Sequence, residues 1–268
     1  MDSFQDLTQA VTCRYHDKIK KACTPLFEHF NVNNFWYDAI SNSGHHTYVG
    51  SHLEWCEYFN AEKLYLNFPY FRHPKFFHSG ASVMEGLQDE SLMRVLGSAR
   101  TKFNIHQQSL LLTNKTSNGV ELYGFSFKRM DLAMIFNELP LLRLFVKKFR
   151  EENQFLFSRM KDNLIDLAKL IGPTFYEESA VASKAQFTRR QEFLKKLGIK
   201  NPLSPREEEV IKLLNQGYSA TQIGKQIFLS PRTIEHHLER MKEKLGCNSK
   251  VELIQRAREL EYYGLLGG

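Results

Sequence analysis

The chain has 268 residues, of which 42% are hydrophobic and 25% are charged, as is typical of a globular protein with room for two ordinary domains. Its net charge of +6 favours a polyanionic partner without identifying one. The four cysteines lack the spacing of a disulfide framework or a zinc site, which excludes a disulfide-stapled scaffold and fits a reducing compartment. No secretion signal opens the sequence, and no run approaches the roughly eighteen apolar residues of a membrane helix. We therefore expect a cytoplasmic protein without a membrane partner.

The first elements are predicted to be a helical region and a β-hairpin. Residues 1–30 carry apolar side chains at helical spacing, and Pro25 interrupts the pattern. Residues 33–40 are rich in aromatic side chains and favour a strand. Residues 42–44 then predict a turn, and residues 46–49 predict the returning strand.

A helix is predicted next, over residues 51–59, because Ser51 is followed by Glu54 at the capping-box position. Residues 65–78 are dense in aromatic side chains, but the two prolines among them exclude a regular helix. This stretch indicates that the first domain has an aromatic core.

A helix and a second pair of strands follow. The pattern predicts a helix over residues 89–103, a strand over 105–113, a polar turn over 114–119 and a strand over 120–128. Helices that alternate with antiparallel strands predict an α/β sandwich with one central sheet for residues 1–176. By analogy, this is the size of a small-molecule sensor domain of the PAS or GAF kind.

One long helix is predicted over residues 141–171, ending before Pro173. Its apolar residues repeat at steps of three, four or seven positions, which gives one apolar stripe. Such a stripe is either part of the domain core or the seam of a dimer, and the sequence leaves both interpretations open.

The sequence shows no catalytic motif. It contains neither a glycine-rich phosphate loop nor a G-x-S-x-G elbow, so we predict that the protein is not an enzyme. Histidines are plentiful but lack metal-ligand spacing, so no metal or other cofactor is predicted; they are His45, His46, His52, His73, His78 and His106. A haem or metal site that uses one or two of them is the alternative.

Residues 177–200 are predicted to be a basic linker. Between Lys184 and Lys200, six basic residues stand against Glu192 alone. Such a segment would lie along phosphates, or it would be a solvated connection and nothing more.

Residues 201–268 are predicted to form a separate domain of four short helices. A serine stands at the N-cap position of each helix, and three of the four have a Glu or Gln at the capping-box position. These serines are Ser204, Ser219, Ser230 and Ser249. Glycines follow three of the helices, as left-handed stops do; they are Gly217, Gly246 and Gly264. Val251, Ile254 and Ala257 are expected to form the buried stripe of the last helix.

Only Phe228 and Leu229 separate the second of these helices from the cap of the third. So short a connection forces a sharp bend, which predicts a helix-turn-helix. In that motif the second helix enters the major groove of DNA. His237 is expected to face the core, because it lies next to Leu238.

The motifs of this domain are S-P-R-E-x-E-V-I-x-L-L-x-x-G-x-S and I-x-x-x-I-x-L-S-x-R-T-I-E-H-H-L-x-x-M-x-x-K-L-G. They resemble the DNA-binding domain of LuxR-type transcription regulators over its whole length. The resemblance implies a module that binds double-stranded DNA as a dimer, with Glu207 and Ile234 at structural positions. Carried over by position, Thr233, Glu235, His236 and Glu239 face the DNA. The predicted DNA-binding set adds three neighbours from the same helix start and face, namely Ser230, Arg232 and Arg240. A glutamate there either accepts a hydrogen bond from cytosine or projects away.

A second motif, W-x-x-x-F-x-x-x-x-L-x-x-x-F-P, begins at Trp55. It resembles the autoinducer-binding domain of LuxR-type quorum-sensing receptors. The sequence departs from that pattern at Phe59 and Leu64, which stand where the family has tyrosines, and at Phe68. Phe68 stands where the family has the Asp that accepts the amide N–H of the ligand. An unpaired amide N–H costs on the order of 1–3 kcal/mol, so an apolar small ligand is favoured over an acyl-homoserine lactone. The predicted ligand-binding set is Trp36, Trp55, Phe59, Phe68 and Tyr70; the alternative is that these side chains are core packing.

The sequence therefore predicts a homodimeric, DNA-binding transcription regulator of two domains. The first domain senses a small molecule or another signal, and contact with RNA polymerase is a further candidate. The alternative is a ligand-independent regulator, or an adaptor whose first domain only contacts other proteins. An enzyme within residues 1–176 is a rival interpretation, which an enclosed cleft with a perturbed histidine pair would support.

Overall fold

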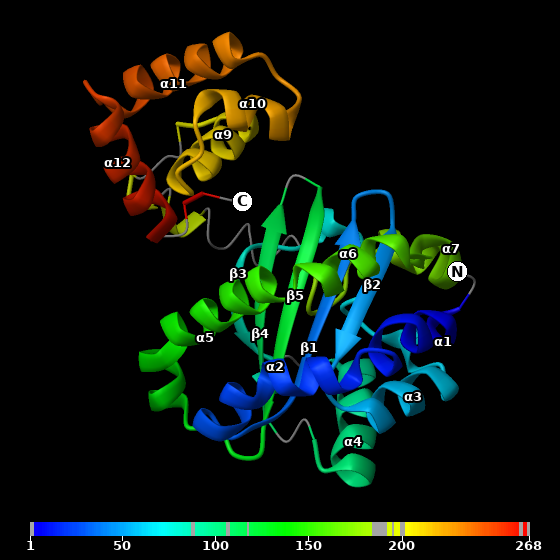
Figure 1. The fold of residues 1–268 in the computed structure, drawn as a ribbon. Helices are drawn as coiled ribbons and strands as arrows, with labels where there is room; N and C mark the ends of the chain where they lie inside the picture. The colour runs from blue at the N-terminus through cyan, green and yellow to red at the C-terminus, as the bar shows by residue number, and fades with distance from the viewer. Residues whose placement is uncertain are drawn as a thin grey trace. The chain divides into compact units, whose positions relative to one another are not determined.

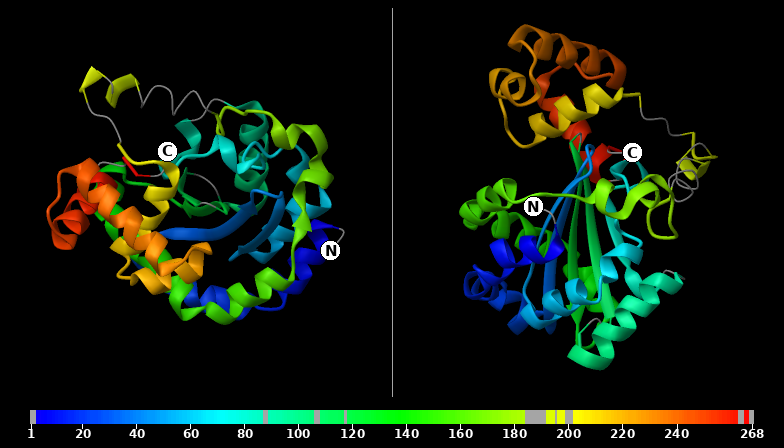
Figure 2. Two further views of the ribbon diagram at one scale, coloured as in Figure 1. Left: turned by 90° about the horizontal axis from the view of Figure 1, so that it is seen from above. Right: turned by 90° about the vertical axis from the view of Figure 1, so that its right-hand side faces the viewer.

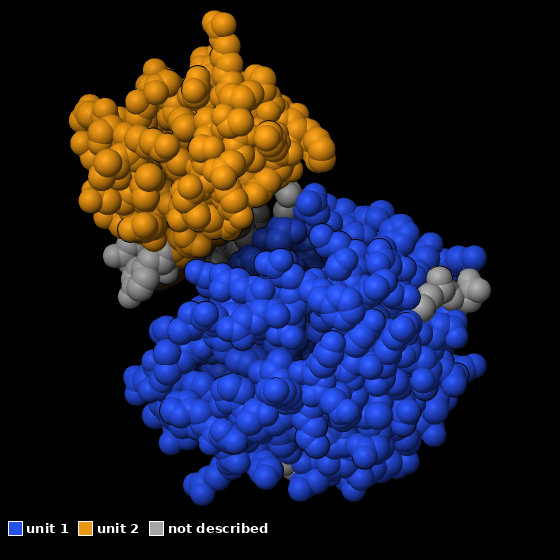
Figure 3. Space-filling view, viewed as in Figure 1, with its two compact units in different colours: residues 1–184 blue, residues 185–268 orange. Residues whose placement is uncertain are grey.

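The structure is a computed structural model, and it divides the chain into two compact units, residues 1–184 and 185–268 (Figures 1 and 3). It describes residues 3–86, 89–105, 108–116, 118–183, 192–194, 196–198, 202–262 and 265–266. No helix within these ranges is both long and apolar enough to cross a membrane. Part of the predicted basic linker, including Lys184 and Lys200, lies outside the described residues.

The first unit is built on an antiparallel sheet of six strands in the described part of the chain, in the order β3-β4-β5-β1-β2-β6. The strands are β1 (Val32–Ser41), β2 (His45–Gly50), β3 (Gly80–Val83), β4 (Gln108–Thr116), β5 (Gly119–Phe127) and β6 (Ile165–Asp166). β1 and β5 pair along their whole length, with Trp36 opposite Gly124. This central pair therefore sets which side chains face each side of the sheet.

One face of the sheet is covered by α2 (His16–His29), α5 (Leu132–Glu152) and α6 (Gln154–Asp162) (Figures 1 and 2). Aromatic rings make the contact. Phe35 of β1 packs against Phe145 and Phe149, with ring centroids 5.3 and 5.1 Å apart. Tyr37 packs against Phe157, at 5.2 Å.

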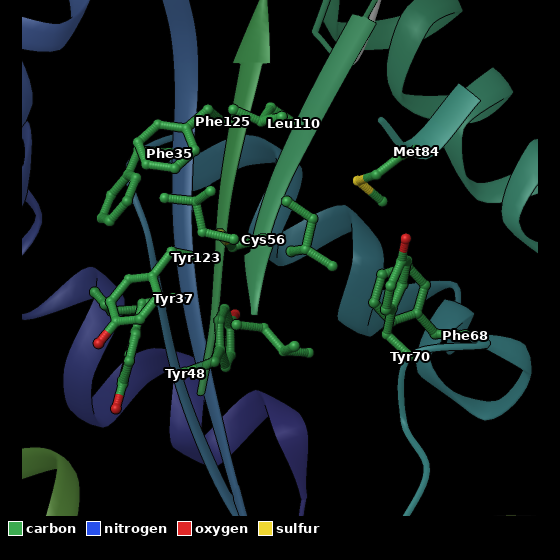
Figure 4. Packing of buried hydrophobic residues seen from close by; sticks show 14 of the residues in the cluster. Phe35, Tyr37, Tyr48, Cys56, Phe68, Tyr70, Met84, Leu110, Tyr123 and Phe125 are labelled. Carbon is green, nitrogen blue, oxygen red and sulfur yellow. The ribbon is translucent and has the colours of Figure 1, made fainter. Parts of the chain in front are cut away.

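The other face is covered by α3 (Leu53–Ala61) and α4 (Glu90–Phe103) (Figure 2). Figure 4 shows Phe68, Tyr70 and Met84 on this side of the strands and Phe35 and Tyr37 on the opposite side. Shorter helical segments complete the unit: α1 (Phe4–Leu7), a π-helix (Thr8–Cys13), α7 (Leu167–Ile171) and four 3-10 turns, at Leu64–Asn67, Pro74–Phe76, Met84–Gly86 and Gly172–Tyr176. The predicted α/β fold with one central antiparallel sheet is thus confirmed.

The single long helix predicted over residues 141–171 is wrong. The helix begins earlier, at Leu132, and ends at Glu152, because the backbone of the C-cap Asn153 leaves the helical region with φ −113° and ψ 32°. A separate helix follows, and residues 165–166 then pair with β2 as a short edge strand. The apolar periodicity is real, but it continues across these breaks and so conceals them.

Three local predictions in the first unit are also corrected. His52, not Ser51, caps α3, because the Ser51 hydroxyl is committed to the Phe35 N–H at 2.8 Å and to Asn34. Strand β4 extends through the predicted turn to Thr116, which leaves a tight connection to β5. Pro25 lies inside α2 and does not end it.

The second unit contains α9 (Pro205–Asn215), α10 (Ala220–Ile227), α11 (Pro231–Leu245) and α12 (Lys250–Tyr262). The predicted caps are confirmed at Ser204, Ser219 and Ser230, and the first two form complete capping boxes. At the fourth helix Ser249 accepts from the Glu252 N–H at 3.1 Å, but the Glu252 carboxylate reaches Asn248. The two glycine stops inside the described residues are left-handed, with φ 89° at position 217 and 65° at position 246; Gly264 lies outside them.

The four helices of the second unit bury one apolar core, which includes Val210, Ile223, Ile234, Leu238, Met241, Leu253, Ala257 and Leu260. The predicted stripe of the last helix is wrong at Val251, which is 65% exposed. Leu253 is buried in its place, because α12 starts at Lys250 and turns position 253 towards α9 and α11.

Candidate functional site

Local backbone conformation and hydrogen bonds hold the bend between α10 and α11 tight. Phe228 takes a left-handed conformation with φ 57°, and the Leu229 N–H donates to the carbonyl of Gly224 at 2.9 Å. A Cβ added at Gly224 would lie 2.4 Å from the Leu229 carbonyl oxygen, so only glycine fits there. Arg206 of α9 donates to the Ile227 carbonyl at 2.5 Å and so ties the end of α10 to the first helix.

The helix α11 has one buried and one open face. Ile234, Leu238 and Met241 are buried in the core. The opposite face exposes the predicted residues Arg232, Glu235, His236, Glu239 and Arg240. Side chains three and four positions apart lie on one side of a helix, so these five form a continuous surface, which we call the α11 face.

The other two predicted residues of this set have a local role at the helix start. The Ser230 hydroxyl accepts from the Thr233 N–H at 3.0 Å and lies 2.7 Å from the Thr233 hydroxyl. Ser230 is exposed and Thr233 is half-buried. Their hydroxyls are therefore held by the N-cap, and this fixes the direction in which the first turn of α11 leaves the bend.

The charges on the α11 face are unevenly paired. Glu239 forms an ion pair with Lys242 at 2.7 Å, and its side chain stays 64% exposed. Glu235 makes no ion pair with any described residue, and it is open to accept a hydrogen bond. His237 is half-buried rather than in the core, and its enclosed Nδ1 has no hydrogen-bond partner among the described residues.

A partly buried ion pair joins α9 to α11 beneath this face. Glu207 of α9 is 1% exposed and accepts from Lys244 of α11 at 2.6 Å and from the Ser204 N–H at 2.7 Å. Burial alone would raise the pKa of Glu207, but the hydrogen bonds from Lys244 and from Ser204 lower that pKa to about 2. The sequence revealed the capping half of this arrangement; Lys244 is too distant in the chain to be paired by inspection.

The first unit holds a cavity of about 60 Å³ between the sheet and α3 and α4. Four of the five predicted ligand residues line it, namely Trp36, Trp55, Phe59 and Phe68. Tyr70 is buried beside Phe68 but is not part of the wall. The volume is below the roughly 150 Å³ of an apolar cavity that accepts benzene, so a ligand with a ring must displace part of the aromatic wall.

The cavity wall also includes polar residues that sequence reasoning missed. Asp38 of β1 is 4% exposed and its Oδ1 lies 2.8 Å from Nε2 of His46, which is fully buried. Among the described residues this histidine is the only hydrogen-bond partner of the Asp38 side chain. Tyr48 also lines the wall, and burial raises the pKa of its hydroxyl well above the usual value. The even-numbered positions of the predicted hairpin were the available signal, because they place 38, 46 and 48 on one face.

Trp36 reaches the cavity by lying across Gly124 of the neighbouring strand. A Cβ at Gly124 would come within 1.9 Å of the Trp36 ring. The absence of a side chain at that position is therefore what allows the indole to lie flat on the sheet.

No group of three His, Cys, Asp or Glu side chains that could hold a metal ion occurs in the described part of the chain. Of the histidines named above, His106 lies outside that part. His73 caps the turn at Pro74, and His52 caps α3.

Comparison with known proteins identifies the second unit. Residues 201–257 match the family model described as bacterial regulatory proteins, luxR family. A putative HTH-type transcriptional regulator of Mycobacterium bovis is 42% identical over 55 residues, which are 20% of this chain and 6% of that protein. The transcriptional regulatory protein DegU of Brevibacillus brevis is 24% identical over 152 residues, which are 56% of this chain and 57% of that protein. The chain thus spans between 6% and 57% of these two relatives.

Among solved structures, SdiA in complex with octanoyl-rac-glycerol is similar, with a TM-score of 0.40 and 12% identity. The likeness covers 89% of this chain and 86% of that one. A crystal structure of Escherichia coli SdiA gives a TM-score of 0.34 at 13% identity, covering 99% of this chain and 93% of that one.

Proposed function

We propose that this protein, whose C-terminal domain belongs to the LuxR family of bacterial regulatory proteins, is a homodimeric transcription regulator that reads double-stranded DNA with the α11 face. The observation that carries the proposal is the geometry of α11. The helix leaves a glycine-dependent bend, is braced from below by Glu207 and Lys244, and exposes Arg232, His236 and Arg240 together.

The chemistry of the α11 face suits base edges in a major groove. Arg232, His236 and Arg240 supply hydrogen-bond donors for guanine O6 and N7 or for phosphates, and Glu235 supplies an acceptor for cytosine N4. The ion pair with Lys242 offsets part of the repulsion between Glu239 and phosphates. The seven predicted residues of this set thus divide into five that contact DNA and two, Ser230 and Thr233, that direct the helix.

We infer further that the first unit senses a small, mostly apolar molecule in the cavity next to Trp36. Asp38 gives the cavity one buried acceptor, so the ligand carries a single N–H or O–H donor. Phe68 occupies the position of the acceptor in the autoinducer-binding pattern, and Asp38 offers an acceptor from strand β1 instead. The small volume of the cavity favours the alternative of a regulator without a ligand, and a bound molecule would decide between them.

The DNA half of the proposal is tested by selecting duplexes from a random pool with the full chain. Affinities for a selected and a scrambled duplex are then measured by fluorescence anisotropy. We expect His236→Ala and Arg232→Ala each to reduce the preference for the selected duplex by about tenfold, because a good base contact is worth about 1–3 kcal/mol. Gln255→Ala, at an exposed position of α12, is the matched control and should leave the preference unchanged. Unaltered discrimination in both α11 variants would count against the assignment.

The proposed ligand binding is tested by native mass spectrometry of the full chain, purified under non-denaturing conditions. A retained small molecule is expected in the wild type, and it should be lost in Val95→Phe, which adds bulk to a buried residue of the cavity wall. Phe155→Ala, on the surface of α6, should retain it. Two results together favour the ligand-independent alternative. The wild type shows only the mass of the protein itself, and no molecule of a small-compound library stabilises the protein.

A further inference from the structure

The cavity of the first unit has a carboxylate in its wall and no positive side chain beside it. None of the described residues that line the cavity is a lysine, an arginine or a histidine. Burial raises the pKa of the Cys56 thiol to about 12 and the pKa of the Tyr48 hydroxyl well above its usual value, so both side chains are uncharged at neutral pH. Among the described residues of the wall, the carboxylate of Asp38 is therefore not balanced by any other charge.

The hydrogen-bond partner of Asp38 is a histidine that lies behind the wall. Nε2 of His46 is 2.8 Å from Oδ1 of Asp38. The histidine ring is fully buried, with its centroid 4.9 Å from that of Phe71 and 5.3 Å from that of Phe4. Its Nδ1 has no hydrogen-bond partner among the described residues. A second N–H on this ring would have no acceptor, so we assign the single proton to Nε2, which donates it to Asp38. The pair then keeps the negative charge of the carboxylate.

The rest of the wall suits a positive charge. Trp36, Trp55, Phe59 and Phe68 line the cavity. The ring of Phe59 lies 5.7 Å from that of Trp55 and 5.5 Å from that of Phe68, measured between centroids, so these three form a continuous aromatic surface. Aromatic faces attract cations, and a buried carboxylate is costly unless a positive charge pairs with it. A cation in this cavity would satisfy both groups.

The volume of the cavity limits the size of such a cation. A water-sized group needs about 15 Å³, so the cavity of about 60 Å³ has room for about four non-hydrogen atoms. Asp38 offers one acceptor, which takes one N–H, and the remaining atoms then lie against aromatic rings. A protonated tertiary amine meets these requirements, because it has one N–H and three alkyl groups.

We propose that the cavity of the first unit binds a small protonated tertiary amine of the size of trimethylammonium, with its N–H on Asp38 and its alkyl groups against the aromatic wall. The inference rests on the ligand sensing of the proposed function and names the chemical class of the ligand. A larger amine of the same class must displace part of the aromatic wall.

The test is a fluorescence titration of the full chain with three probes of equal size and different charge: trimethylammonium, propan-2-ol and acetate. The two tryptophans of the chain, Trp36 and Trp55, both line the cavity, so their emission reports on its occupancy. The ionic strength is held constant with sodium chloride at neutral pH. We expect a saturable change with trimethylammonium, with a dissociation constant at least about tenfold below that of propan-2-ol. Acetate should give no saturable change.

The substitution Asp38→Asn removes the charge and keeps an oxygen that can accept from His46. The preference for trimethylammonium over propan-2-ol should then fall to within about threefold. Asp17→Asn removes a charge from an exposed position of α2, which covers the other face of the sheet, and should leave the preference unchanged. Far-UV circular dichroism shows whether each variant is folded, and the comparison of the three probes on the wild type does not depend on the variants.

Three results would overturn the proposed ligand class. They are propan-2-ol or acetate binding as tightly as trimethylammonium, trimethylammonium giving no saturable change, and a preference that survives in folded Asp38→Asn. Failure of the proposed function is recognised separately. A different molecule retained in native mass spectrometry leaves the first unit a sensor of another ligand class, and sequence-preferring DNA binding is measured independently of either result.

Discussion

The buried carboxylate of Glu207 links the N-terminus of α9 to α11. Its carboxylate closes the α9 capping box and also holds Lys244 near the end of α11. The ordinary pKa of this group is 4.5, and in the folded protein the pKa is lowered to about 2. A group whose pKa is lowered on folding stabilises the fold fully above its ordinary pKa, and loses that effect as the pH falls towards its folded value.

Substitution Glu207→Gln should therefore lower the free energy of unfolding of the second unit by on the order of 2 kcal/mol at pH 7. The difference from wild type should shrink as the pH is lowered from about 4.5 towards about 2. Urea unfolding followed by far-UV circular dichroism checks this. Both tryptophans lie in the first unit, so the transition followed by tryptophan fluorescence is the internal control and should not move. A variant as stable as wild type at pH 7 would show that the ion pair does not brace the fold.

At the scale of elements, the pairing of β1 with β5 places residues that are far apart in the sequence next to each other. Trp36 and Gly124 are far apart in the chain, yet they are opposite each other in register, and the indole occupies the space that a side chain at 124 would need. The alternation of each strand was predictable from its residues. The pairing that turns position 124 into part of the cavity was not, because register is a property of two strands at once.

Gly124→Ala should destabilise the first unit by about 1–3 kcal/mol, as over-packing a filled site does, and should push the Trp36 ring towards the cavity. Tryptophan fluorescence will show both effects, as an earlier unfolding transition and a changed emission maximum. Gly97→Ala is the matched control, because a Cβ at Gly97 in α4 meets no atom within 4 Å. Alanine also favours a helix interior over glycine by about 1 kcal/mol, so this variant should be equally stable or more so. If Gly124→Ala and Gly97→Ala change the unfolding transition and the emission maximum equally, the close approach of Trp36 does not restrict the side chain at position 124.

At the scale of the whole molecule, the two units differed in how far the sequence could predict them. In the second unit the caps, the glycine stops and the two-residue bend are local signals, and the helix starts followed from them at Ser204, Ser219 and Ser230. In the first unit the α/β sandwich was predictable from alternating patterns. The break at Asn153 and the edge strand at Ile165 depend on tertiary contacts and carry no local signal. For the Asp38–His46 pair, the hairpin pattern indicated only that the two residues share a face of the sheet.

The same division holds for the candidate sites. The α11 face follows from helical periodicity once the start of the helix is known, so its exposed residues could be named in advance. The cavity could be predicted only as a group of aromatic residues. Its acceptor, Asp38, and the exclusion of Tyr70 from its wall became visible when the strands were placed beside α3 and α4.

The salt dependence of DNA binding by the full chain shows whether the open side of α11 lies in a charged duplex groove. Anisotropy titrations of the selected duplex between about 50 and about 200 mM salt should give an affinity that falls linearly on a double-logarithmic plot, with a slope of several units, because each neutralised phosphate releases counterions. The combined substitution of Arg232 and Arg240 by alanine should make that slope shallower, while Gln255→Ala should not. Binding that is indifferent to salt, or a slope that both variants leave unchanged, would contradict the account.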